Sequence, residues 1–97
     1  MTGVGLERLQ GLTSLRELNL SHTQVGDAEL KHLKGLPSLQ SLDLSYTDVS
    51  EAGLEHLKGL SKLQLLQLLR TKVGRDGVNN LRRALPDCTI VDRVRMN

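Results

Sequence analysis

Histidine and cysteine are the residues of this 97-residue chain that most readily catalyse reactions or bind metals. His32 and His56 lie 24 positions apart, so on equivalent helices of a repeat they would lie one above the other. Zinc requires further ligands at about 2 Å from the ion. The next positions of that column hold Arg8 and Asn80, which supply none. We therefore interpret both histidines as solvent-facing helix residues and predict no metal site.

Other catalytic patterns are equally incomplete. His22 follows Ser21, but adjacent strand residues face opposite ways and no acid is placed to orient an imidazole. Gly3 and Gly5 lack the third glycine and the preceding strand of a dinucleotide-binding loop, and no phosphate-binding GK[ST] sequence occurs. No carboxylate pair stands at inward-facing positions. The sequence predicts a protein without enzymatic activity and without a cofactor.

Cys88 is the single cysteine, which excludes an internal disulfide. It shares one face of a short segment with Ile90, so we predict a buried, apolar role and consider a reactive thiol the weaker alternative. The sequence shows neither a signal peptide nor an apolar run of membrane-spanning length. These observations favour a cytoplasmic protein with no membrane partner.

Leucine recurs at intervals of 24 residues, which is the strongest pattern in the chain. The recurring positions are Leu6, Leu9, Leu12, Leu15, Leu18 and Leu20, then Leu30, Leu33, Leu36, Leu39, Leu42 and Leu44, then Leu54, Leu57, Leu60, Leu63, Leu66 and Leu68. A period of this length predicts a solenoid in which each repeat contributes one slice of a shared core.

The leucine spacing also predicts the elements of each repeat. Leucines two positions apart, such as Leu18 and Leu20, predict a short strand with both side chains inward. From Leu30 to Leu36 the spacing is three, among alanine, glutamate, lysine and histidine, which favours a short helix. The positions expected to N-cap these helices hold Gly26, Ser50 and Gly74. Strands stack more closely than helices do, so we expect the strand side to be concave.

The segments 15–25, 39–49 and 63–73 read LRELNLSHTQV, LQSLDLSYTDV and LQLLQLLRTKV. They resemble the leucine-rich repeat pattern L-x-x-L-x-L-x-x-N-x-L, with threonine where asparagine is usual. The halves that follow resemble bacterial, planctomycete-like repeats of 24 residues. The resemblance implies an α/β fold: a leucine-rich repeat solenoid, wound as a right-handed βα superhelix, with a short parallel concave sheet and short helices on the convex side. We also expect a hydrogen-bond ladder through the hydroxyls of Thr23, Thr47 and Thr71.

We predict one domain over 1–97, formed by a partial repeat at 1–14, repeats at about 15–38, 39–62 and 63–86, and a C-terminal cap at 87–97. The cap should contain a final strand at 89–91. The chain is expected to enter at a helix over 4–12 and to leave Leu6, Leu12 and Leu18 at an uncapped N-terminal edge. More repeats upstream, a partner or a second copy would cover that edge.

The outward strand positions form columns that give the candidate binding surface. Tyrosine and arginine are enriched at interface hot spots, and two leucines point outward from the third strand. The candidate partner-binding residues are Glu17, Asn19, His22, Asp43, Tyr46, Leu65, Gln67, Leu69 and Arg70. Ordinary variation of a solvated surface is the alternative interpretation.

The predicted function is therefore a non-enzymatic module that binds a protein partner on its concave face. The alternatives are a recognition segment of a larger enzyme system, such as a ubiquitin-ligase adaptor, an effector or a kinase, and a self-associating structural unit. Residues 70–97 carry seven lysines and arginines against three aspartates, which suits a solvated cap or an acidic partner. One tyrosine and no other aromatic residue argue against nucleic-acid recognition by base stacking.

Overall fold

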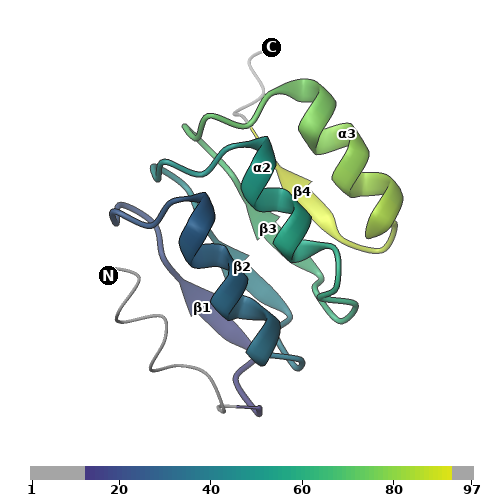
Figure 1. Cartoon of the computed structure of the whole chain (residues 1–97). Coiled ribbons are helices and arrows are strands. Elements are labelled where there is room, and N and C mark those ends of the chain that lie inside the picture. The colour runs from purple at the N-terminus through teal and green to yellow at the C-terminus, as the bar shows by residue number, and fades with distance from the viewer. Residues whose placement is uncertain (1–12, 93–97) are drawn as a thin grey trace.

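Four short strands and a row of short helices make up the computed structural model of the chain, which describes residues 13–92 (Figure 1). The strands are β1 (Glu17–Asn19), β2 (Ser41–Asp43), β3 (Leu65–Gln67) and β4 (Thr89–Val91). The helices are η1 (Asp27–Gly35), α2 (Glu51–Leu54) with η2 (Glu55–Leu57) directly after it, and α3 (Arg75–Ala84). The strands form one parallel sheet in chain order, and the helices lie over one of its faces (Figure 1).

The register of the sheet follows the leucine period. Leu18 lies opposite Leu42, Leu42 opposite Leu66, and Leu66 opposite Ile90. Each pairing joins residues that are 24 positions apart, so equivalent side chains of successive repeats lie next to one another. The predicted alignment and the predicted final strand are both confirmed.

The buried leucines of strands and helices form one apolar core between the sheet and the helices. Leu20, Leu44 and Leu68 reach it from the strand side, and Leu33 and Leu57 reach it from the helix side. Each of these side chains is at most 1% exposed. Burial of one such leucine is worth about 1.5–3 kcal/mol, so the repeated pattern stabilises the stacked arrangement.

The spacing of the buried residues matches the type of helix in η1 and in α3, although α2 is an α-helix in a repeat with the same spacing as that of η1. In η1 the leucines recur every third residue, which matches the three residues per turn of a 3₁₀ helix. In α3 the buried positions are Val78, Leu81 and Leu85, and the added residue before Leu85 suits an α-helix. The following loop is one residue shorter, because Cys88 and Ile90 are two positions apart where Leu63 and Leu66 are three. β4 therefore stays in register with β3.

The three threonines close their own repeats and do not form the predicted ladder between repeats. Thr23, Thr47 and Thr71 donate their hydroxyl hydrogens to the carbonyls of Leu20, Leu44 and Leu68, at 2.6, 2.6 and 2.9 Å. The acceptor lies three residues earlier in each case. Each hydroxyl therefore bonds to a backbone carbonyl of its own repeat and not to a neighbouring repeat. The ladder prediction was wrong for this reason.

Several expectations for the chain ends lie outside the described residues. They include the helix over 4–12, the edge residues Leu6 and Leu12, and the last five positions of the cap. Leu18, the described member of that edge, is half-buried and packs against the core. Within residues 13–92, no helix has the length and apolar character needed to cross a membrane.

Candidate interaction site on the strand face

The sheet has one face against the core and one face turned away from the helices. The central residue of β2, β3 and β4 is buried, whereas the residues on either side of it are exposed or half-buried. The outward residues pair across the strands as two columns. They are Glu17, Ser41, Leu65 and Thr89, and Asn19, Asp43, Gln67 and Val91. We call this surface the strand face.

Side chains of the second column hold the turns that follow β1 and β2. Asn19 Oδ1 accepts hydrogen bonds from the Ser21 N–H at 2.9 Å and from the Ser21 hydroxyl at 2.6 Å. Asp43 Oδ1 accepts from the Ser45 N–H at 2.9 Å. Such bonds two residues ahead are typical of Asx turns. They fix both side chains through one oxygen each.

The next residue of each turn has an uncommon backbone conformation. His22, Tyr46 and Arg70 have φ values of 58°, 59° and 56°, in the left-handed region. For residues other than glycine this region costs about 1–2 kcal/mol. The His22 N–H donates to the Ser45 carbonyl and the Tyr46 N–H to the Leu69 carbonyl, at 3.0 and 2.7 Å. These bonds keep the three turns aligned, and we call His22, Tyr46 and Arg70 the left-handed column.

Two members of the left-handed column are in contact. The rings of His22 and Tyr46 stack with centroids 4.3 Å apart and planes 12° from parallel. Tyr46 is nevertheless 49% exposed. Arg70 is exposed and has no ion pair or side-chain hydrogen bond with any residue of 13–92. The stack thus leaves about half of Tyr46 accessible to a partner.

The outward leucines are less accessible than the sequence predicts. Leu65 and Leu69 are half-buried, so the expected exposed apolar pair is only partly formed. Leu65 lies between Ser41 and Thr89 in its column, and these neighbours cover part of it. Ser45 is 4% exposed, and its hydroxyl oxygen accepts from the Leu69 N–H at 3.1 Å. Sequence reasoning missed this link, because a buried serine on an outward column has no signature of its own.

All nine predicted site residues lie on the strand face or in the turns directly after it. Five lie on β1, β2 and β3, three form the left-handed column, and Leu69 precedes Arg70. Their character changes across the sheet. Carboxylates stand on β1 and β2 at Glu17 and Asp43, whereas the third repeat contributes leucines and Arg70.

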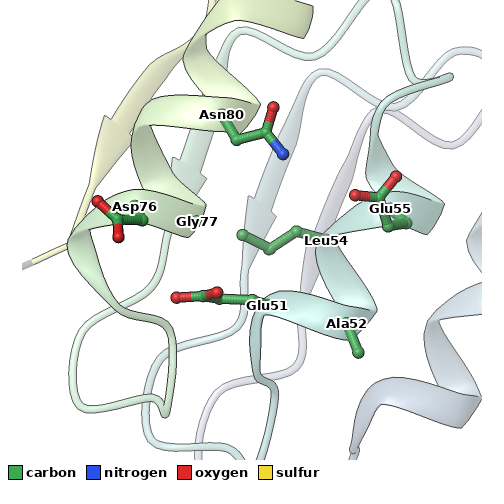
Figure 2. Close-up of a pocket in the computed structure, with 7 residues that line it drawn as sticks. All are labelled: Glu51, Ala52, Leu54, Glu55, Asp76, Gly77 and Asn80. Carbon is green, nitrogen blue, oxygen red and sulfur yellow. The ribbon is translucent and has the colours of Figure 1, made fainter.

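A groove on the helix side was not predicted. It has a volume of about 370 Å³ and lies between α2 and α3, where Glu51 and Leu54 extend towards Gly77 (Figure 2). Its other lining residues are Ala52, Glu55, Asp76 and Asn80. Lys58 lies 3.0 Å from the Glu55 carboxylate, and the described residues contain no group of three or more potential metal ligands. The groove is acidic without the arrangement of a metal site.

Of the residues with catalytic potential, His22 belongs to the left-handed column, whereas Cys88, His32 and His56 lie apart from the strand face. Cys88 is 8% exposed and belongs to the core, so its predicted apolar role is confirmed. Burial raises the pKa of its thiol, which disfavours the reactive thiolate. His32 and His56 are half-buried on the helix side, so they are less open to solvent than predicted.

A family model described as leucine-rich repeats in two copies matches residues 13–56. The matched segment contains β1 and β2, and the same register continues through β3 and β4. Residues 13–56 are thus leucine-rich repeats. The planctomycete-like subtype stays a prediction from the sequence.

Among solved structures, this chain is similar to a chain from the structure of Chaetomium Mex67:Mtr2 subunits, with a TM-score of 0.76 and 17% sequence identity. The match covers 99% of this chain and 73% of that one. At this identity the likeness concerns the fold alone. No curated protein matches the chain.

Proposed function

We propose that this chain is a non-enzymatic binding module that holds a protein partner on its strand face. Leucine-rich repeat domains generally mediate protein–protein interaction. The observation that supports the strand face is its register: side chains of three consecutive repeats form continuous outward columns. In such columns each repeat adds one side chain, so a partner can contact several repeats at once.

The columns combine several kinds of contact. Asn19, Asp43 and Gln67 offer polar groups in one row, and the first two are fixed by their turns. Leu65 and Tyr46 offer apolar surface beside them. A polar surface with fixed donors and acceptors next to partly exposed apolar groups resembles the rim and core of a protein interface. We expect this face to be concave and to accept a folded or extended partner.

Site-specific photo-crosslinking tests the proposal. A benzophenone amino acid replaces Gln67 on the strand face in one variant and Arg83, exposed on α3, in the matched control. Both are irradiated in an extract of the source organism, and crosslinked proteins are identified by mass spectrometry. A protein captured at position 67 and not at 83 is then purified and titrated by calorimetry.

The expected result is a partner whose affinity falls strongly with Gln67→Arg and Asp43→Lys and is unchanged with Arg83→Glu. A partner that binds the strand-face variants as tightly as the natural chain would show that the interface lies elsewhere. Circular dichroism of each variant establishes that the fold is retained.

A further inference from the structure

The residue types of the left-handed column are unusual for their backbone conformation. Glycine adopts this region at no steric cost, and asparagine does so readily. All three repeats instead place a large planar side chain there: an imidazole, a phenol and a guanidinium. The turn geometry explains the positive φ in each repeat but not the choice of these side chains. Residues held in costly conformations cluster at binding and catalytic sites.

Contacts within the chain account for part of this choice. His22 and Tyr46 stack on one another, which gives the imidazole a structural role. Tyr46 stays 49% exposed in spite of this stack, and Arg70 has no partner side chain in residues 13–92. An aromatic ring beside an unpaired arginine is the combination found at interface hot spots. The guanidinium is suited to hold a carboxylate with two parallel hydrogen bonds.

The surrounding charges narrow the class of ligand. Lys72, the other cation of the third turn, lies 3.9 Å from Asp48, so its charge is partly balanced. Glu17 and Asp43 place further carboxylates on the first two strands. A nucleic-acid strand carries a phosphate at every nucleotide and would meet these carboxylates along its path. A protein segment with one or two carboxylates at Arg70 and apolar side chains over Tyr46 and Leu69 avoids that repulsion.

From these observations we infer that the left-handed column is the anchor of the interface, and that it binds a partner segment in which an acidic residue neighbours aromatic or aliphatic residues. Arg70 pairs with the carboxylate, and the exposed part of Tyr46 together with the edge of Leu69 covers the apolar side chain. This inference rests on the proposed function and specifies the chemistry of the partner.

Selection from a phage-displayed library of short random peptides tests it. The natural chain, Arg70→Gln and the control Arg83→Gln are immobilised and panned in parallel. Arg83 is a matched control because it is an exposed arginine on the helix side. Enriched peptides are synthesised with a fluorophore, and their affinities are measured by fluorescence polarisation. A fluorescent single-stranded oligonucleotide is titrated under the same conditions.

The natural chain and Arg83→Gln are expected to enrich peptides with aspartate or glutamate next to an aromatic or aliphatic residue. Arg70→Gln should weaken these peptides about tenfold, which corresponds to about 1.4 kcal/mol. In a charge-reversal experiment, Arg70→Glu should lose the acidic peptide and gain a version in which lysine replaces the acidic residue. This exchange would demonstrate direct pairing, since a general loss of structure cannot produce it.

Enriched peptides without acidic residues, or peptides that Arg70→Gln binds unchanged, would overturn the inference. If such peptides still lose affinity with Gln67→Arg, binding to the strand face stands and only the anchor is wrong. Oligonucleotide binding that is tighter than peptide binding and depends on Arg70 would also overturn it, in favour of a nucleic-acid ligand.

Discussion

The carboxylate of Asp27 accepts hydrogen bonds from both the backbone N–H and the hydroxyl of Ser50, which stands at the N-cap of the helix in the next repeat. The N–H bond measures 2.6 Å. Ser50 makes no capping bond within its own helix. The first turn of one helix thus caps the next, and a negative charge lies near the N-terminus of α2, where the helix dipole favours it.

Replacement of Asp27 by alanine should reduce stability. The change removes a charged acceptor that is shared by two donors. A hydrogen bond to a charged group contributes about 1.5–3 kcal/mol to the free energy of unfolding. We expect Asp27→Ala to lower the free energy of unfolding by about 1–3 kcal/mol. Urea denaturation followed by circular dichroism measures this. Asp48→Ala is the control, since Asp48 forms only a long, exposed ion pair with Lys72, and such pairs contribute little.

Gly53 and Gly59 should respond in opposite ways to alanine. A Cβ at Gly53 would lie 2.4 Å from Asp27 Oδ1 and 2.8 Å from Leu30 Cδ1. Alanine is favoured over glycine in a helix by about 1 kcal/mol, but overpacking costs about 1–3 kcal/mol and would also displace the Asp27 cap. We expect Gly53→Ala to destabilise the chain. A Cβ added at Gly59 would meet no described atom within 4 Å beyond the neighbouring residues, so Gly59→Ala should be neutral or stabilise by up to about 1 kcal/mol. Equal denaturation midpoints for the two variants would contradict the packing described.

The same position of the next repeat uses different chemistry. Glu51 is equivalent to Asp27, and its side chain lies against Gly74 and Gly77, where a Cβ would approach its atoms to 2.9 and 2.5 Å. No hydrogen bond from Glu51 joins α3 in the described part of the chain, so the longer side chain fills space between the helices. The leucine period does not predict that Asp27 caps the next helix whereas Glu51, its equivalent, only packs against the next helix.

Most of the fold was predictable because the buried positions recur with the geometry of the elements. Leu18, Leu42 and Leu66 differ by one period, and this offset determines the strand register. The period of two within each strand also predicted which residues face outward. The type of helix was not predicted, since the same leucine spacing of three accompanies a 3₁₀ helix at η1 and a short α-helix at α2.

The site was predicted as a set of columns, but its conformation was not. In a sequence, positive φ values are usually indicated by glycine or asparagine. The three positions hold instead His22, Tyr46 and Arg70. The half-burial of Leu65 depends on its neighbours Ser41 and Thr89 across the sheet, which a single repeat does not reveal. The threonine hydroxyls were assigned to the wrong acceptors, because their own strands offer a nearer carbonyl.

Thr47→Val should therefore destabilise its own repeat. Valine keeps the shape but removes the hydroxyl that donates to the Leu44 carbonyl at 2.6 Å, in a residue that is buried. A buried carbonyl without a partner costs about 1–3 kcal/mol. Thr71→Val should cost less, because that residue is only half-buried, the bond that its hydroxyl donates measures 2.9 Å, and the bond that it accepts from the Val73 N–H is long, at 3.4 Å. A larger loss at Thr71 than at Thr47 in urea denaturation would show that burial does not determine the effect.

Alkaline pH should destabilise the chain through Cys88. Burial raises the pKa of this thiol above its ordinary value of 9.0. Between pH 9.0 and the raised pKa, the unfolded chain releases a proton that the folded chain retains, so the free energy of unfolding decreases as pH rises. Cys88→Ala should be less stable at neutral pH, since it leaves a small cavity, but should decline less steeply above pH 9.0. Parallel declines for both proteins would assign the alkaline effect to other groups.

Arg70→Gly should separate stability from binding. Glycine removes the left-handed cost of about 1–2 kcal/mol, while its greater freedom in the unfolded chain costs about 0.5–1 kcal/mol. Arg70 contributes no ion pair or side-chain hydrogen bond within residues 13–92 that would be lost. The free energy of unfolding should thus stay level or rise slightly, whereas affinity for acidic peptides falls. Arg70→Val is the matched control, because a β-branched residue tolerates positive φ poorly and should destabilise. If Arg70→Gly unfolded more easily than Arg70→Val, the arginine would have a structural role that accounts for its place in the turn.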